Sequence, residues 1–118
     1  MFTTYSLCVR DVKSEKEFEQ LTETLKKADL FNYVFVYGRL EKDTACFESY
    51  EQQLWHSHYG DMVIISEMHP NMIFQLTCYR EDGAVWQEYY HDGMTECCTG
   101  EVIFEQPHKV KWDCLVEF

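Results

Sequence analysis

The sequence predicts a single α+β domain, residues 1–118, in which two helices cover one face of an antiparallel sheet. Two segments, 14–28 and 57–69, repeat apolar residues at helical spacing. Most other apolar residues lie in short alternating runs rich in aromatic side chains, which make up 16% of the chain. A chain of 118 residues is long enough to bury one hydrophobic core.

The first two predicted elements are a strand and a helix. Residues 4–10 alternate apolar and polar side chains, the pattern of a strand with one buried face. Ser14 then provides a helix N-cap, and Glu17, three residues later, completes a capping box. The apolar face of this helix carries Phe18, Leu21, Leu25 and Ala28. Lys26 and Lys27 occupy its last turn, where the helix dipole favours cations.

Two strands, a second helix and a buried strand follow. Residues 33–40 predict a strand with aromatic side chains on one face, and residues 44–55 predict a longer strand. Ser57 caps the second helix, and Pro70 ends it. The inner face of this helix would carry Tyr59, Met62 and Ile65. Residues 72–79 alternate strictly and predict a strand with one face in the core.

The remaining chain predicts an antiparallel extension of the sheet. Two Asp-Gly pairs, 82–83 and 92–93, are hairpin signals. The first pair separates the strand 72–79 from a strand at 84–91, and the second separates that strand from one at 94–105. A final strand follows at 110–118. Gly100 would mark a bulge, and the final strand would dock on the sheet or on a second subunit. The order β-α-β-β-α-β with a C-terminal antiparallel extension is the ferredoxin-like pattern, and the uncovered face of its sheet would be rich in Tyr, Phe and Trp.

The charge balance limits the classes of partner. The chain has 21 acidic and 10 basic residues and a net charge of -11. Phosphate recognition needs clusters of Lys and Arg, so we expect neither direct nucleic-acid binding nor binding to an anionic membrane. No apolar run reaches the roughly 18–20 residues that span a membrane, and no signal peptide is apparent at the N-terminus. The charge favours solubility or a basic protein partner, and the expected location is the cytoplasm.

The cysteines predict buried thiols and no catalytic nucleophile. They stand at positions 8, 46, 78, 97, 98 and 114. Without a secretion signal, reduced thiols are expected, and most lie in predicted strands, where they act as small hydrophobes. Cys78 or Cys98 could pair with His91 as a nucleophile, but acidic neighbours in a strand interior would raise the thiol pKa.

The histidines and tryptophans suggest binding sites that have simpler structural explanations. His56, His58 and His69 could ligate zinc, but no thiol pair or acidic ligand stands at motif spacing. The sequence therefore predicts no metal, no cofactor and no enzyme. Three tryptophans and a tyrosine pair could stack nucleotide bases, and these residues are Trp55, Trp86, Trp112, Tyr89 and Tyr90. Core packing, cross-strand pairs or a protein interface are the alternatives.

An ordered set of residues in the second half of the chain resembles a family of small proteins from phages and plasmids. The set is Trp55, His58, Asp61-Met62, Ser66, Pro70, Phe74, Leu76, Trp86, Tyr89 and Asp92-Gly93. It is similar to the YubB-type ferredoxin-like domain of mobile elements, over about residues 54–105. The turn at 80–83 is shorter than the acidic, glycine-rich turn common in that family. The resemblance implies a ferredoxin-like fold and a phage or mobile-element source, and it implies no catalytic residues.

An acidic stripe on the first helix suggests mimicry of nucleic acid. Glu15, Glu19 and Glu23 recur every four residues, at a Cβ spacing of about 5–6 Å that is similar to that of successive phosphates. A plain solvated helix face is the alternative. The residues expected to contact a partner are Glu15, Glu19, Glu23, Glu48, Glu51, Trp55, His58, Asp61, Trp86 and Tyr89.

Together these features predict a phage or mobile-element accessory protein that acts by binding a protein in the cytoplasm of an infected bacterial host. Its acidic surface would occupy a basic, nucleic-acid-binding groove, as in an anti-CRISPR or anti-restriction counter-defence inhibitor. One alternative is a small-ligand or metal-binding protein that uses Trp55, His56, His58 and Asp61. Another is a homodimer or larger homo-oligomeric structural module, in which the C-terminal strand pairs between subunits.

Overall fold

The computed structural model places two helices and seven strands in the part of the chain that it describes. The described residues are 3–30, 34–35, 37–49, 55, 57–103 and 106–113. The strands are β1 (Thr3–Arg10), β2 (Tyr37–Glu41), β3 (Thr44–Glu48), β4 (Ile73–Arg80), β5 (Val85–His91), β6 (Met94–Ile103) and β7 (Gln106–Asp113). The helices are α1 (Glu15–Lys27) and α2 (His58–Met68).

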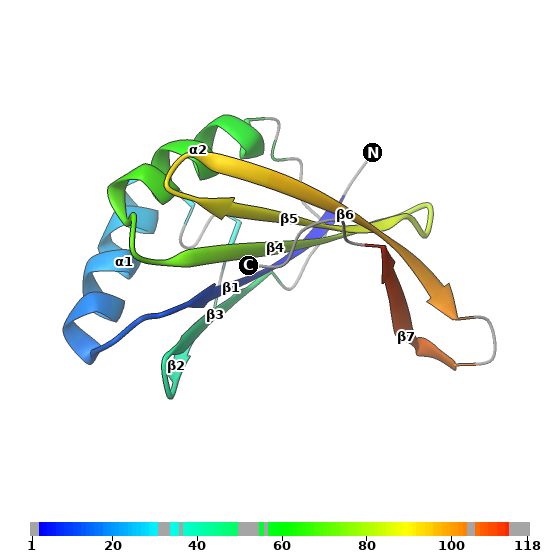
Figure 1. Ribbon diagram of the computed structural model, residues 1–118, viewed down its shortest axis with the longest axis horizontal. Coiled ribbons are helices and arrows are strands. Elements are labelled where there is room, and N and C mark those ends of the chain that lie inside the picture. The colour runs from blue at the N-terminus through cyan, green and yellow to red at the C-terminus, as the bar shows by residue number, and fades with distance from the viewer. Residues whose placement is uncertain are drawn as a thin grey trace.

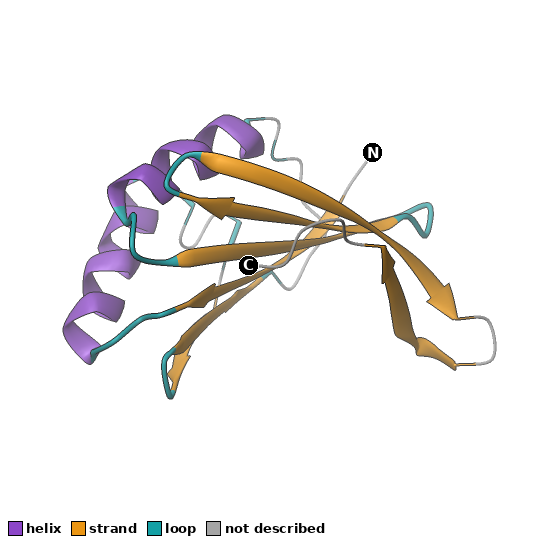
Figure 2. Ribbon diagram, viewed as in Figure 1, coloured by secondary structure: helices purple, strands orange, loops and turns teal. Residues whose placement is uncertain are grey.

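The seven strands form one sheet in the order β2-β3-β1-β4-β5-β6-β7, and every neighbouring pair is antiparallel. Both helices lie on one side of this sheet, and β7 lies at the end farthest from them (Figures 1 and 2). The predicted α+β class, with two helices against one face of an antiparallel sheet, is therefore confirmed. Among the described residues, neither helix is long and apolar enough to cross a bilayer.

The core lies between the helices and the sheet. Along β1, inward side chains from Thr3 to Val9 are buried and their neighbours are half-buried, the alternation that a strand with one covered face requires. Fully or nearly fully buried residues from β1, β4, α1 and α2 include Leu7, Val9, Phe74, Leu76, Leu21, Leu25, Met62 and Ile65. The periodicity of apolar residues therefore predicts most of this core correctly.

The N-terminus of α1 differs from the predicted capping box in one hydrogen bond. Ser14 accepts from the amide of Glu17 at 3.2 Å, as an N-cap does. The Glu17 carboxylate, however, accepts from the amide of Lys13 at 3.0 Å, one residue before the cap. Glu15 and Glu17 lie in the first turn and Lys26 in the last, so the charges suit the helix dipole as predicted.

Helix α2 is bounded as predicted but differs in its cap and in its buried face. Ser57 makes no capping bond to the backbone, and its hydroxyl donates instead to Asp61 at 2.8 Å. The helix ends at Met68, just before Pro70. Met62 and Ile65 are buried, whereas Tyr59, predicted on the same face, is 56% exposed. Apolar residues surround this helix, so spacing alone does not identify its inner face.

The two strands between the helices are shorter than predicted. Strand β2 begins at Tyr37 rather than at residue 33. Val34 instead lies in a turn, and the amides of Val34 and Phe35 both donate to the carbonyl of Leu30. Strand β3 ends at Glu48, because the hydroxyl of the next residue, Ser49, accepts from the amide of Tyr5 and donates to its carbonyl. The rest of the predicted strand, residues 50–54, lies outside the described residues.

The last strand begins earlier than predicted and pairs within the chain. Strand β7 begins at Gln106, includes Pro107 and pairs with β6, which confirms that this segment docks on the sheet. Residues 114–118 lie outside the described part. The predicted bulge at Gly100 is wrong, because the register shift lies between Val102 and Ile103. Gly100 instead allows the Trp112 ring to approach the backbone of β6 closely, because a Cβ at position 100 would lie 2.6 Å from that ring.

The face of the sheet away from the helices, here called the outer face, is more polar than predicted. By strand register its small or polar residues include Ser6, Cys8, Cys46, Gln75, Thr77 and Gln87. Its described aromatic residues are Tyr79, Tyr89 and Trp112. Within the described part of the chain, most large aromatic side chains, such as Phe47, Phe74 and Tyr90, lie in the core instead.

Candidate functional site

One flank of α1 carries the predicted acidic stripe, here called the acidic flank (Glu15, Glu19 and Glu23). All three side chains are exposed. They surround a shallow hollow of about 320 Å³ that Phe18, Thr22 and Lys26 also line. The Phe18 ring stacks on that of Phe47, with centroids 5.9 Å apart, so the apolar floor of the hollow is fixed to the sheet. Carboxylates around an apolar floor suit the cationic side chains of a partner.

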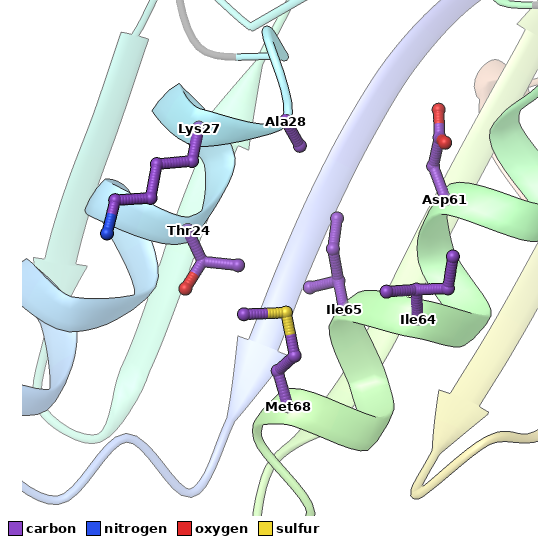
Figure 3. Close-up of a pocket in the computed structure, with 7 residues that line it drawn as sticks. All are labelled: Thr24, Lys27, Ala28, Asp61, Ile64, Ile65 and Met68. Atoms are coloured by element: carbon purple, nitrogen blue, oxygen red, sulfur yellow. The ribbon is translucent and has the colours of Figure 1, made fainter.

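A second hollow, here called the interhelical groove, lies between α1 and α2 and has a volume of about 300 Å³. Its lining residues are Thr24, Lys27, Ala28, Asp61, Ile64, Ile65 and Met68. Figure 3 shows Met68 extending from α2 toward α1, whereas Lys27 points away from α2. Ile64 is 59% exposed and Met68 is 58% exposed. Large apolar side chains clustered on a surface are typical of interaction sites.

The start of α2 is anchored to the core through Trp55. Asp61 accepts from the indole nitrogen of Trp55 and from the hydroxyl of Ser57, both at 2.8 Å. The indole ring is buried and makes edge-on contacts with Tyr5 and Phe35, at centroid distances of 5.3 and 5.9 Å. Trp55 therefore packs as a core residue in this structure, and its predicted contact with a partner stays a prediction.

The first residue of α2, His58, joins strand β5 through the Glu88 network, which consists of Glu88, His58, Trp86 and Tyr90. One carboxylate oxygen of the buried Glu88 accepts from His58 Nε2 at 3.0 Å and from Trp86 Nε1 at 2.7 Å. The other oxygen accepts from the Tyr90 hydroxyl. Three donors thus converge on one carboxylate, which fixes α2 against the sheet.

Electrostatics in the Glu88 network favour a charged pair. Burial acts to raise the pKa of Glu88, but the hydrogen bonds from His58, Tyr90 and Trp86 together outweigh it and lower that pKa. The hydrogen bond to Glu88 raises the pKa of His58 in spite of burial. Because His58 Nε2 is engaged by a carboxylate, it is not available as a metal ligand or as a general base.

A third hollow of about 330 Å³ opens beside the Glu88 network. It is lined by Tyr59, Glu88, Thr95, Glu96 and Cys97. Tyr59 is exposed, and its ring meets that of Tyr90 edge-on at 6.2 Å. Glu96 stands opposite Tyr89 in the sheet, so its carboxylate faces the outer side and only that of Glu88 faces this hollow.

The other predicted partner residues do not join one surface. Glu48 lies on the outer face and accepts from Ser6 at 3.0 Å. Tyr89 also lies on the outer face, where its hydroxyl donates to Gln87 at 3.0 Å. Glu51 and His56 lie outside the described residues. The predicted sites thus fall into the acidic flank, the start of α2 and two positions across the sheet.

The tryptophans that could have formed a base-stacking platform do not share one surface. Trp55 is in the core, and Trp86 lies on the helix side of β5 beside the buried Tyr90. Trp112 faces the opposite side of the sheet, over Gly100. The alternation of side chains in adjacent strands separates these rings, so they cannot stack successive bases on one surface.

The described residues do not bring together the zinc ligands or the Cys/His pair that the sequence left open as alternatives. They contain no group of three or more His, Cys, Asp or Glu side chains suited to a metal. His69 Nε2 pairs with the Thr24 hydroxyl at 2.8 Å, and burial lowers the pKa of His69. Burial raises the pKa of the Cys78 thiol, and Cys98 is disulfide-bonded, which corrects the prediction that this cysteine is reduced.

Sequence reasoning missed Glu88, Ile64 and Met68. Glu88 shares one face of its strand with Trp86 and Tyr90, and a carboxylate between two inward aromatic residues is the signal that would have identified it. No comparable signal identifies Ile64 and Met68, because apolar residues are distributed around the whole circumference of α2 and mark no single buried face.

No protein-family model, curated protein or solved structure matches this chain. The resemblance to the YubB-type domain therefore stays a prediction, and the site must be interpreted from its own geometry.

Proposed function

We propose that this chain acts by binding a protein through its helical layer. The interhelical groove would take apolar side chains of the partner, and the acidic flank of α1 would take basic ones. The expected partner segment is therefore basic and amphipathic, as in a protein groove that binds nucleic acid. The proposal assigns no catalytic residue.

The observation that carries the proposal is the exposure of Ile64 and Met68 in the interhelical groove. More than half of each side chain is in contact with solvent, although their neighbours Met62, Ile65 and Ser66 on the same helix are buried. Covering such side chains gains roughly 25 cal/mol for each Å² of apolar surface removed from water. A partner that fills the groove would thus gain affinity from residues that do not stabilise the core of the isolated chain.

The charge supports a basic partner. The chain has a net charge of -11, and three exposed carboxylates line one flank of α1. Lys13, which precedes the helix, is paired with Asp11 at 3.3 Å, so part of the nearby positive charge is already compensated. A negative surface speeds association with a positive one and makes the association sensitive to salt.

The strand order supports assigning the first six elements to the ferredoxin-like class. The elements run β1-α1-β2-β3-α2-β4, and the corresponding strands are ordered β2-β3-β1-β4 in the sheet. The resemblance to the YubB-type domain, rather than this order, suggests a phage or mobile-element source. On that basis we propose a counter-defence inhibitor that works in the cytoplasm of an infected bacterium.

The test is capture of partners from bacterial lysate on immobilised chain, at low and at raised salt. The groove variant replaces Ile64 and Met68 by Ser, and the flank variant replaces Glu19 and Glu23 by Gln. The matched control is Met94→Ser, because Met94 is 62% exposed but lies in β6 rather than in the helical layer.

A partner retained by wild-type and by Met94→Ser, but lost from both test variants and weakened by salt, would support the proposal. Equal retention by all variants would contradict it. A partner whose retention is unchanged by salt would contradict the electrostatic part, because exposed charges more than about 10 Å apart are screened at 0.1 M salt.

A further inference from the structure

Two free cysteines meet across adjacent strands on the outer face of the sheet. Cys8 of β1 stands directly opposite Cys46 of β3, and their sulfur atoms are 3.5 Å apart. Both thiols are half-buried, and neither is part of a disulfide. The helices lie on the other side of the sheet (Figure 2), so they do not cover this pair.

The backbone already satisfies the requirement for a disulfide. Directly opposite residues in an antiparallel pair have Cα atoms about 4.5–5.5 Å apart. Disulfides join residues whose Cα atoms are about 4.4–6.8 Å apart, with sulfur atoms at about 2.05 Å. The two sulfur atoms would therefore need side-chain rotation to close from 3.5 Å to bonding distance, with no rearrangement of β1 or β3.

We propose that Cys8 and Cys46 form a redox modification site that is oxidised to a cross-strand disulfide by a low-molecular-weight disulfide. The thiolate of one cysteine attacks a sulfur of the oxidant, which breaks the S–S bond of the oxidant, forms a mixed disulfide and releases one thiol. The second cysteine, after losing its proton, attacks the mixed disulfide and releases the other thiol. The two cysteine sulfurs lose two electrons in total, and the oxidant is reduced to two thiols.

The surroundings of the pair determine the rate of this reaction. Arg39 of β2 is opposite Cys46, and Glu48 lies two residues further along β3. Burial, together with the hydrogen bond to Cys46, raises the pKa of Cys8 to about 12. Because thiolate is the attacking species, oxidation at neutral pH is slow, and it accelerates as the pH rises. The pair responds to sustained oxidation rather than to a brief pulse.

The bond would join the β2–β3 hairpin to the middle of the sheet. It would close a loop of 38 residues between strands that the folded state already holds together. Such a bond stabilises a protein mainly by restricting its unfolded chain. For a domain of this size, the midpoint of thermal unfolding should rise by about 10 °C.

The experiment compares reduced protein with protein incubated with oxidised glutathione at pH 8.5. Digestion after Arg, Lys and Glu leaves Cys8 in peptide 1–10 and Cys46 in peptide 43–48, so the bond joins two peptides that mass spectrometry resolves. The test variants are Cys8→Ser and Cys46→Ser. The matched control is Cys97→Ser, which removes an exposed thiol of β6.

Wild-type and Cys97→Ser should yield the joined peptides and the rise in the unfolding midpoint. The Ser variants at Cys8 or Cys46 should yield neither. The rise is measured as the difference between wild-type and Cys46→Ser, which removes any contribution from the disulfide at Cys98. Separate glutathione adducts on Cys8 and Cys46, or two thiols that both stay open to alkylation in folded protein, would overturn the proposal.

Discussion

Replacement of Glu88 by Gln tests whether the Glu88 network holds α2 on the sheet. The carboxylate accepts from His58, Trp86 and Tyr90, and both of its oxygens are used. Glutamine has the same shape but only one acceptor oxygen. Its NH₂ group must therefore face at least one of the three donors, and the charge that pairs with His58 is lost.

The magnitude follows from the burial of the pair. The side chains of His58 and Glu88 are 26% and 11% exposed, so both charges are largely removed from solvent. Removing one partner of a buried ion pair costs about 3–5 kcal/mol. Because glutamine keeps the packing and one acceptor, we expect a loss near the lower end, about 3 kcal/mol. In a domain of 118 residues this lowers the unfolding midpoint by roughly 10 °C.

The loss depends on pH in a defined direction. The pKa of Glu88 is lowered from 4.5, so its contribution is present above about pH 4.5 and is lost as the pH falls through the folded-state pKa. The pKa of His58 is raised from 6.5, so its contribution is present below about pH 6.5 and is lost as the pH rises through the folded-state pKa. The difference between wild-type and Glu88→Gln should thus be largest between about pH 4.5 and 6.5.

The assay is urea unfolding followed by circular dichroism at pH 5.5 and at pH 8.5. The control is Glu96→Gln, which removes an exposed carboxylate of the neighbouring strand β6 on the outer face of the sheet. Glu96→Gln should change the free energy of unfolding by less than about 0.5 kcal/mol. If the two variants are equally stable at pH 5.5, the reasoning about the Glu88 network is wrong.

Three further substitutions test other contacts. Trp55→Phe removes the hydrogen bond to Asp61 and should cost about 1–2 kcal/mol in urea unfolding; an unchanged midpoint would mean that this bond does not anchor α2. Ser14→Ala removes the N-cap of α1 and should cost about 1 kcal/mol, and equal stability of Ala and Ser at this position would contradict the capping geometry. Ser66→Ala leaves the amide of Gly93 without its 2.9 Å acceptor, so this amide should exchange its proton faster than in wild-type.

Elements with strong local signals were predicted well from the sequence. The N-cap of α1, the proline after α2 and the alternation in β1 and β4 all act within a few residues, so pattern reasoning identifies them. The Asp-Gly turns are confirmed too, since Asp92 and Gly93 both adopt a positive φ, as a tight hairpin requires.

Features set by distant contacts were predicted poorly. Strand β3 ends early because Ser49 bonds to the backbone of Tyr5, 44 residues away, and no local pattern shows this. Distant contacts also determine much of the candidate functional site. The acidic flank follows from helical spacing, but the partners of Glu88 come from α2 and β5, and the exposure of Ile64 depends on where α1 packs.

Photo-crosslinking from the interhelical groove tests the central claim most directly. A photoreactive phenylalanine derivative replaces Ile64 in one protein and Met94 in another, since both side chains are well exposed but only the first lines the groove. Irradiation in bacterial lysate, the source of the proposed partner, should give a covalent adduct with another protein from position 64 and none from position 94. Adducts from position 94 alone, or from neither position, would contradict binding through the helical layer.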